Sequence, residues 1–187
     1  MLDMASVASI LSASDKLRRG MERYKGIMDA LHRTNVATDR AFQKAFNGFF
    51  VMRSRKSAYY DMFYLFLEQK KEKGVSFAET LAYLKGAEGR LETSFSSKLV
   101  HVIDPGQPIW DKNVAVQHFG LKLPGYGLDR DARQAEIVRV YETYCEQFYA
   151  YMASPEGKTV IDMFDEKYPD AGSTDVKKVD FILWADV

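Results

Sequence analysis

Residues 21–31 read MERYKGIMDAL. The apolar side chains of this stretch recur at steps of three or four positions: Met21, Tyr24, Ile27, Met28 and Leu31. Because an α-helix has about 3.6 residues per turn, this spacing places them on one stripe of a helix. The stripe predicts an amphipathic helix over residues 14–32 that buries one face. Ser14 and Asp15 are suited to cap its start, and Asn35 to follow its end.

The same spacing recurs along nearly the whole chain. Thr38 is predicted to cap the next helix and Gly48 to end it, whereas Ser76 and Glu79 form a capping-box pattern. No segment of useful length alternates apolar and polar residues with period two, which argues against strands. The sequence therefore predicts an all-α fold, a single compact multi-helix domain. Further helices are expected over residues 38–47, 59–73, 77–85, 96–103, 110–119, 129–152 and 174–184, with one more starting at Ser154 and Pro155.

Length and composition favour one domain over residues 1–187. A chain of 187 residues, of which 47% are hydrophobic, can bury one core and is short for two. No apolar run approaches the roughly 20 residues that a membrane span needs, and no cationic segment precedes the apolar opening. We therefore expect a cytoplasmic protein with no membrane partner. Cys145 is the only cysteine, which argues against a metal site built from cysteines.

Charge is unevenly distributed along the chain. Residues 1–100 carry 17 Lys and Arg against 11 Asp and Glu, whereas residues 101–187 carry 9 against 15. A basic half can mark a face that binds nucleic acid, although a solvated helix face explains the same pattern. Residues 40–60 contain no acidic residue but several basic ones: Arg40, Lys44, Arg53, Arg55 and Lys56.

Residues 94–114, SFSSKLVHVIDPGQPIWDKNV, contain the chemistry-bearing groups. Small residues at a helix start let backbone N–H groups approach an anion such as a phosphate. A lysine amine can serve as a nucleophile, and a carboxylate at a helix start can assist proton transfer. Lys98 and Asp111 are the candidates for these two roles. The pattern resembles the helix-hairpin-helix signature of base-excision DNA glycosylases, and most closely the branch that excises 8-oxoguanine.

The resemblance implies a reaction and a partner. In this family a lysine amine attacks the sugar carbon, the N-glycosidic bond breaks, and a lyase step can then cut the strand. Lys98 would be the nucleophile, and Asp111 would assist its deprotonation and stabilise the cationic sugar. The partner would be double-stranded DNA carrying an oxidised base, which must be swung out of the duplex.

Residues for DNA contact follow from the same comparison and from composition. Ser94 and Ser96 stand where the family has hairpin glycines, and Ser97 follows them. Asn47 begins a segment that we interpret as DNA-facing because Arg53 and Arg55 follow it. Aromatic side chains that could stack on the extruded base are Phe49, Phe50, Trp110 and Trp184.

Other interpretations remain open at this point. Lys98 can be an ordinary lysine on a helix surface, and Asp111 can be only the cap of a helix that begins at Trp110. The chain would then be a catalytically silent helical module that binds nucleic acid or a protein partner. We assign no cofactor and no metal, because no second ligand stands at metal spacing from His32, His101 or His118. These three histidines are interpreted as structural or solvent-facing.

Overall fold

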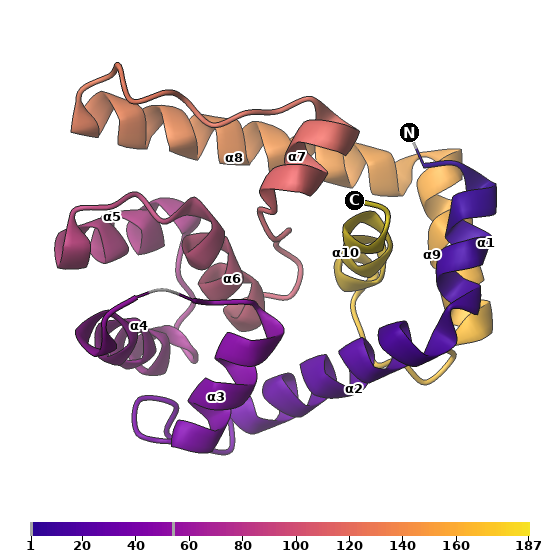
Figure 1. Ribbon diagram of the computed structural model, residues 1–187, viewed down its shortest axis with the longest axis horizontal. Helices are drawn as coiled ribbons and strands as arrows, with labels where there is room; N and C mark the ends of the chain where they lie inside the picture. The colour runs from indigo at the N-terminus through magenta and orange to yellow at the C-terminus, as the bar shows by residue number, and fades with distance from the viewer. Residues whose placement is uncertain (1, 54) are drawn as a thin grey trace. The chain divides into compact units, whose positions relative to one another are not determined.

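The computed structural model describes residues 2–53 and 55–187, and its regular structure there is entirely α-helical (Figure 1). This confirms the all-α class expected from the sequence. The helices are α1 (Met4–Ser12), α2 (Ser14–Leu31), α3 (Arg40–Phe49), α4 (Ser57–Lys70), α5 (Phe77–Glu88), α6 (Thr93–Ile103), α7 (Lys112–Phe119), α8 (Arg130–Ala153), α9 (Pro155–Lys167) and α10 (Asp175–Ala185).

The helices form two compact units. The central unit comprises residues 19–104, and the terminal unit comprises residues 1–18 together with residues 105–187. One boundary falls inside α2 and the other lies between Asp104 and Pro105. Organisation as one domain over residues 1–187 stays a prediction.

Most helix starts follow local capping rules. The Ser76 hydroxyl accepts the Glu79 N–H at 3.1 Å, as the capping-box pattern predicts. Ser154 caps α9 by accepting the Gly157 N–H at 3.1 Å, and Pro155 follows it at the first helical position. The short helix α1, which was not predicted, starts in the same way, since the Asp3 carboxylate accepts the Ala5 N–H at 3.3 Å.

Helix α3 differs from its prediction at both ends. The cap is Asp39, whose Oδ1 accepts the N–H groups of residues 41 and 42 at 2.9 and 3.0 Å, so Thr38 was the wrong choice. Gly48 does not end the helix, because α3 continues to Phe49. Among the described residues, Val51 is the one non-glycine residue with positive φ, 53°, and the Met52 N–H donates to the Asn47 carbonyl at 3.0 Å. The left-handed turn that usually follows a helix at a glycine is therefore made by a valine.

Differences from the predicted bounds also occur in α5, α6 and α7. Helix α5 runs through Gly86 and ends before Gly89, its C-cap, which adopts φ 68°. Helix α6 begins at Thr93, three residues before its predicted start, and is buried on almost every side. Helix α7 begins at Lys112 rather than at Trp110, because Asp111 is its cap.

Each unit has its own apolar core. In the central unit, α4 buries Tyr59, Phe63, Tyr64, Phe66 and Leu67, and α5 packs against both α4 and α6. In the terminal unit, α10 packs against α7, α8 and α9, and α1 packs against α9 and α10. The long helix α8 contributes Ile137, Tyr141, Tyr144 and Phe148 to that core.

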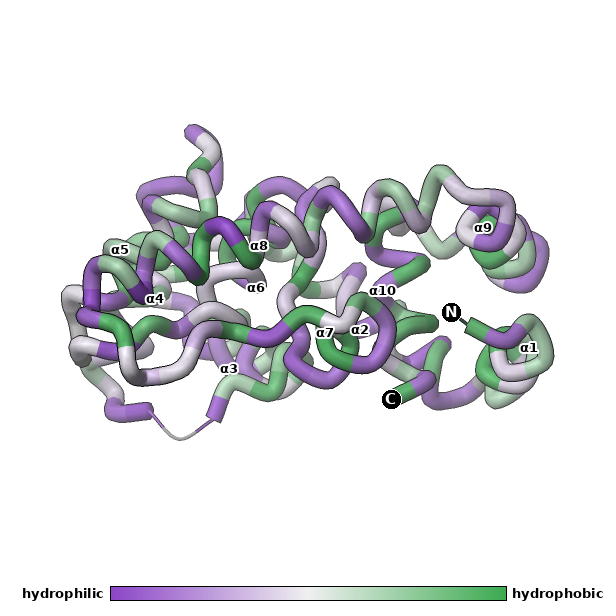
Figure 2. The backbone as a smooth tube through the Cα atoms, turned by 90° about the horizontal axis from the view of Figure 1, so that it is seen from above, coloured by the Kyte–Doolittle hydropathy of each residue, from purple (hydrophilic) through white to green (hydrophobic). Residues whose placement is uncertain are grey.

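Hydrophobic and hydrophilic stretches alternate over short distances along the helices (Figure 2). Within residues 2–53 and 55–187, no helix combines the length and apolar character needed to cross a membrane.

Candidate functional site

Lys98 lies in the middle of α6 in the central unit. Its Nζ donates to the Phe50 carbonyl oxygen at 2.8 Å and lies 5.6 Å from the centre of the Phe95 ring. A carbonyl oxygen and an aromatic face are both favourable neighbours for an ammonium group. The Phe50 carbonyl belongs to the turn that contains Val51, so the position of the Lys98 amine depends on that turn.

Asp111 is the N-cap of α7 in the terminal unit. Its Oδ1 accepts the N–H groups of Asn113 and Val114 at 2.8 and 3.3 Å. This is the helix-start position that the resemblance requires of the aspartate, and also the position of an ordinary cap. Lys98 belongs to the central unit and Asp111 to the terminal unit.

The three serines assigned to DNA contact lie in the first half of α6. Residues 94–96, which the resemblance assigns to a hairpin, are helical here. Ser96 and Ser97 are completely buried, whereas Ser94 is half-buried. The Ser97 hydroxyl donates to the Ser94 carbonyl oxygen at 3.0 Å, and the Ser96 hydroxyl is buried without a hydrogen-bond partner.

The three candidates for DNA contact between α3 and α4 and at the end of α3 have different environments: Asn47, Arg53 and Arg55. Arg55 forms an ion pair with Glu92, with Nη2 2.8 Å from Oε1, and its guanidinium lies 5.0 Å from the Phe95 ring centre. Its charge is therefore largely neutralised inside the central unit. Arg53 is exposed in the loop between α3 and α4. Asn47 is engaged internally, because its Oδ1 accepts the Tyr64 hydroxyl at 2.7 Å.

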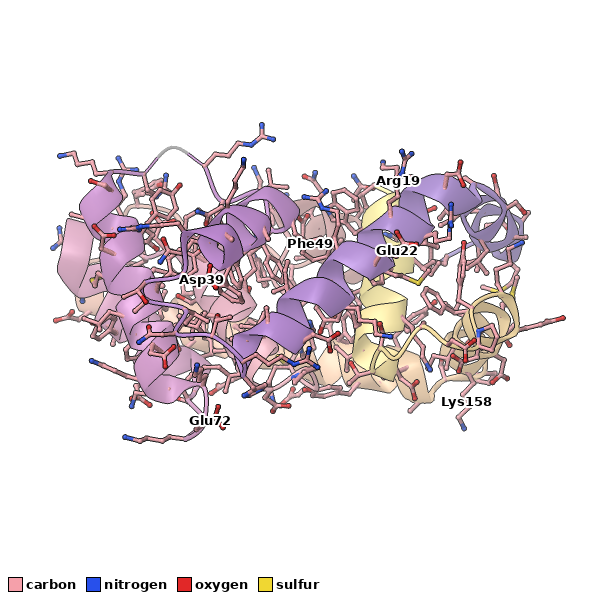
Figure 3. The ribbon with its side chains drawn as sticks, turned by 90° about the horizontal axis from the view of Figure 1, so that it is seen from below. Arg19, Glu22, Asp39, Phe49, Glu72 and Lys158 are labelled. Carbon is pink, nitrogen blue, oxygen red and sulfur yellow. The ribbon has the colours of Figure 1, made fainter. Side chains whose placement is uncertain are left out.

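The proposed stacking aromatics lie mainly in the cores. The Phe50 ring is buried, 4.6 Å from the Phe46 ring centre, and Trp110 packs edge-on against Tyr144 at 5.2 Å. Phe49 is only partly buried and lies beside α2 at the end of α3 (Figure 3). Trp184 is half exposed, with the Lys16 ammonium 5.4 Å from its ring centre.

A buried pair on α2 and α6 was not anticipated from the sequence. The Tyr24 hydroxyl lies 2.9 Å from Nε2 of His101, and both side chains are buried. The Phe49 ring lies 5.8 Å from Tyr24, and the Arg23 guanidinium 5.9 Å from Phe49. His101 follows Lys98 by three residues, so both side chains lie on one side of α6. The three-residue spacing of Lys98 and His101 was the only feature of the sequence that pointed to His101.

The terminal unit contains a second unanticipated pair. Nζ of Lys177 lies 2.6 Å from Oδ2 of Asp180, and both side chains are buried on α10. Burial is the main cause that raises the pKa of the neighbouring Tyr144 phenol, and the negative charges of Asp180 and Asp111 add to it. The free-energy cost of removing the two charges from water offsets their attraction. A buried ion pair is therefore weak evidence of stabilisation.

Burial also perturbs two other titratable groups. Burial raises the pKa of the Cys145 thiol to about 11 and lowers that of His118. In the part of the chain that the structure describes, no three His, Cys, Asp or Glu side chains are grouped so that they could hold a metal ion.

Comparison with known proteins returned no relative: no family model, no curated protein and no solved structure matches this chain.

Proposed function

We propose that this chain is a glycosylase-like protein that acts on damaged DNA, with Lys98 as the nucleophile and Asp111 as its acid/base partner. The observation that supports it best is the position of the Lys98 amine, which a carbonyl oxygen 2.8 Å away holds on an otherwise buried helix. A nucleophile must be held in one place to react at a useful rate. Asp111 stands at a helix start, as the same chemistry requires.

The reaction would proceed by exchange of bonds at one sugar carbon. The Lys98 nitrogen forms a bond to C1′ while the bond from C1′ to the base breaks, and the base leaves with the bonding electrons and takes up a proton. The Asp111 carboxylate would take the proton that the attacking amine loses. Opening of the sugar ring then leaves a Schiff base, which water hydrolyses and borohydride reduces to a stable amine.

The test is reductive trapping. The full chain is incubated with duplexes that carry oxidised guanine, uracil or an abasic site, with borohydride present. We expect a covalent adduct that is lost in Lys98→Gln. Lys112→Gln is the matched control, because Lys112 is an exposed lysine beside Asp111 and has no assigned role. An adduct that persists in Lys98→Gln would exclude Lys98 as the nucleophile, and no adduct on any duplex would exclude the enzyme activity.

A second candidate is a catalytically silent helical module that binds nucleic acid. It is favoured by the structural partners of both candidate residues: the Lys98 amine bonds to a backbone carbonyl and the Asp111 carboxylate caps α7. Under this proposal, duplex binding persists in Lys98→Gln and weakens steeply as salt increases, because cations on the protein replace those released from DNA. Absence of duplex binding in dilute salt would exclude it.

A further inference from the structure

The most exposed large aromatic side chain of the described residues belongs to the loop between α7 and α8. Tyr126 is 89% exposed, whereas the other exposed large hydrophobic side chains are at most half exposed. The loop runs back alongside the N-terminal half of α8 (Figure 1). It lies entirely within the terminal unit.

Tyr126 is paired with a cation from α8. The Arg133 guanidinium lies 4.1 Å from the centre of the Tyr126 ring, well inside the range of a cation–π contact. Nε of Arg133 also donates to the Pro124 carbonyl oxygen at 3.3 Å. Arg133 therefore holds both the ring and the loop against the first turn of α8. Because Tyr126 remains 89% exposed, a large part of its ring is still open to solvent.

The chain segment around Tyr126 contains further exposed charged residues, among them the acidic Asp131. Lys122 and Arg130 are exposed on either side of Tyr126 in the sequence. Gly125 and Gly127 flank it directly, and a Cβ atom placed at either glycine would meet nothing within 4 Å. The nearby Asp129 carboxylate is engaged as the cap of α8, accepting two backbone N–H groups at 3.0 Å. The ring, which is 89% exposed, is therefore accessible to a planar ligand.

We propose that Tyr126 and Arg133 form a stacking platform for an unpaired nucleobase of a nucleic-acid strand. A base offers a flat π-face to the tyrosine ring. The negative phosphates of its strand would be attracted to the positive charges of Lys122 and Arg130. Stacking of this kind tolerates any base, because every base has a π-face. The inference rests on the proposed function for its partner class, nucleic acid, but it involves neither Lys98 nor Asp111.

The test compares strands with and without bases. The full chain is titrated into labelled oligothymidylate of roughly 12 nucleotides, and into an abasic backbone of the same length. We expect tighter binding to the strand with bases. Tyr126→Ala should reduce that preference by roughly tenfold, the scale of one stacked base, and Tyr126→Phe should retain it. Tyr149→Ala is the matched control, because Tyr149 is an exposed tyrosine on α8 outside the platform.

The outcomes separate this inference from the proposed function. Equal affinity for both strands, or a Tyr126→Ala variant that binds as the unmodified chain does, would overturn the platform. Lys98→Gln should keep the preference for bases even though it loses any trapped adduct. An adduct without base-dependent binding would overturn the platform alone. Melting temperatures of the two Tyr126 variants should match that of the unmodified chain, since a ring that is 89% exposed contributes little to stability.

Discussion

The Tyr24 hydroxyl and Nε2 of His101 lie 2.9 Å apart, although 77 positions separate them in the chain. Both side chains are buried, so their hydrogen bond connects α2 to α6 where water does not compete. Tyr24→Phe removes only the hydroxyl. We expect the free energy of unfolding to fall by about 1–3 kcal/mol, the usual effect of deleting one partner of a buried hydrogen bond.

Denaturant unfolding measures this effect, with Tyr149→Phe as the control. The Tyr149 hydroxyl also forms one hydrogen bond, to the backbone carbonyl of Gly106 at 2.9 Å, but at an exposed position. The control should change stability by less than about 0.5 kcal/mol. Equal losses of unfolding free energy in the two variants would contradict the prediction that the buried hydrogen bond contributes more than the exposed one.

Val51 adopts a left-handed backbone conformation, with φ 53°, that is unfavourable for a β-branched residue. Its side chain is 49% exposed, so little packing is lost when it is removed. Val51→Gly should therefore increase the free energy of unfolding by about 1 kcal/mol, since glycine adopts this conformation without strain. Val75→Gly should instead lower stability, because Val75 has no positive φ. A destabilised Val51→Gly variant would contradict this prediction.

Gly157 packs against the end of α8 so closely that a side chain does not fit. A Cβ atom there would overlap the Tyr151 carbonyl oxygen and lie 2.8 Å from the Met152 Cα. Gly157→Ala should reduce the free energy of unfolding by about 1–3 kcal/mol through overpacking. Gly26→Ala is the matched control: Gly26 lies inside α2 with nothing within 4 Å, and alanine there should stabilise by about 0.5–1 kcal/mol. Thermal unfolding of both variants should show shifts of opposite sign.

Burial lowers the pKa of His118 from its ordinary value of 6.5, although the Asp186 carboxylate at 3.6 Å opposes this effect. Because the folded pKa lies below the unfolded one, the unfolded chain binds more protons between the two values. The contribution of His118 to stability is therefore present above pH 6.5 and is lost as the pH falls through and below it. Free energies of unfolding measured from pH 7 to pH 5 should decrease, and the decrease should be smaller in His118→Gln. A variant with an unchanged slope would refute this assignment.

Much of the helical architecture could be predicted from the sequence, because helix periodicity and caps depend on residues a few positions apart. Ser76 with Glu79 and Ser154 with Pro155 mark helix starts in the sequence and in the structure. The prediction failed where two local signals competed. Thr38 and Asp39 both qualify as caps, and only the backbone path, with Asp39 directly before α3, shows which one is used.

The candidate site depended more on tertiary structure. The sequence identified Lys98 and Asp111 from residue type and spacing, and it placed Asp111 near a helix start. It could not show that the Lys98 amine bonds to a carbonyl 48 positions away, or that Arg55 is neutralised by Glu92. Such partners are far apart in the chain, so no local periodicity contains them.

The sequence by itself determined that the chain is helical and where most helices begin, because the stripe of apolar residues and the caps act within one or two turns. Only the tertiary structure decided that residues 1–18 join residues 105–187 in one unit, and that His101, Lys177 and Asp180 are buried. The physical reason is that burial of polar groups depends on which helices pack together, and packing joins residues that the sequence separates.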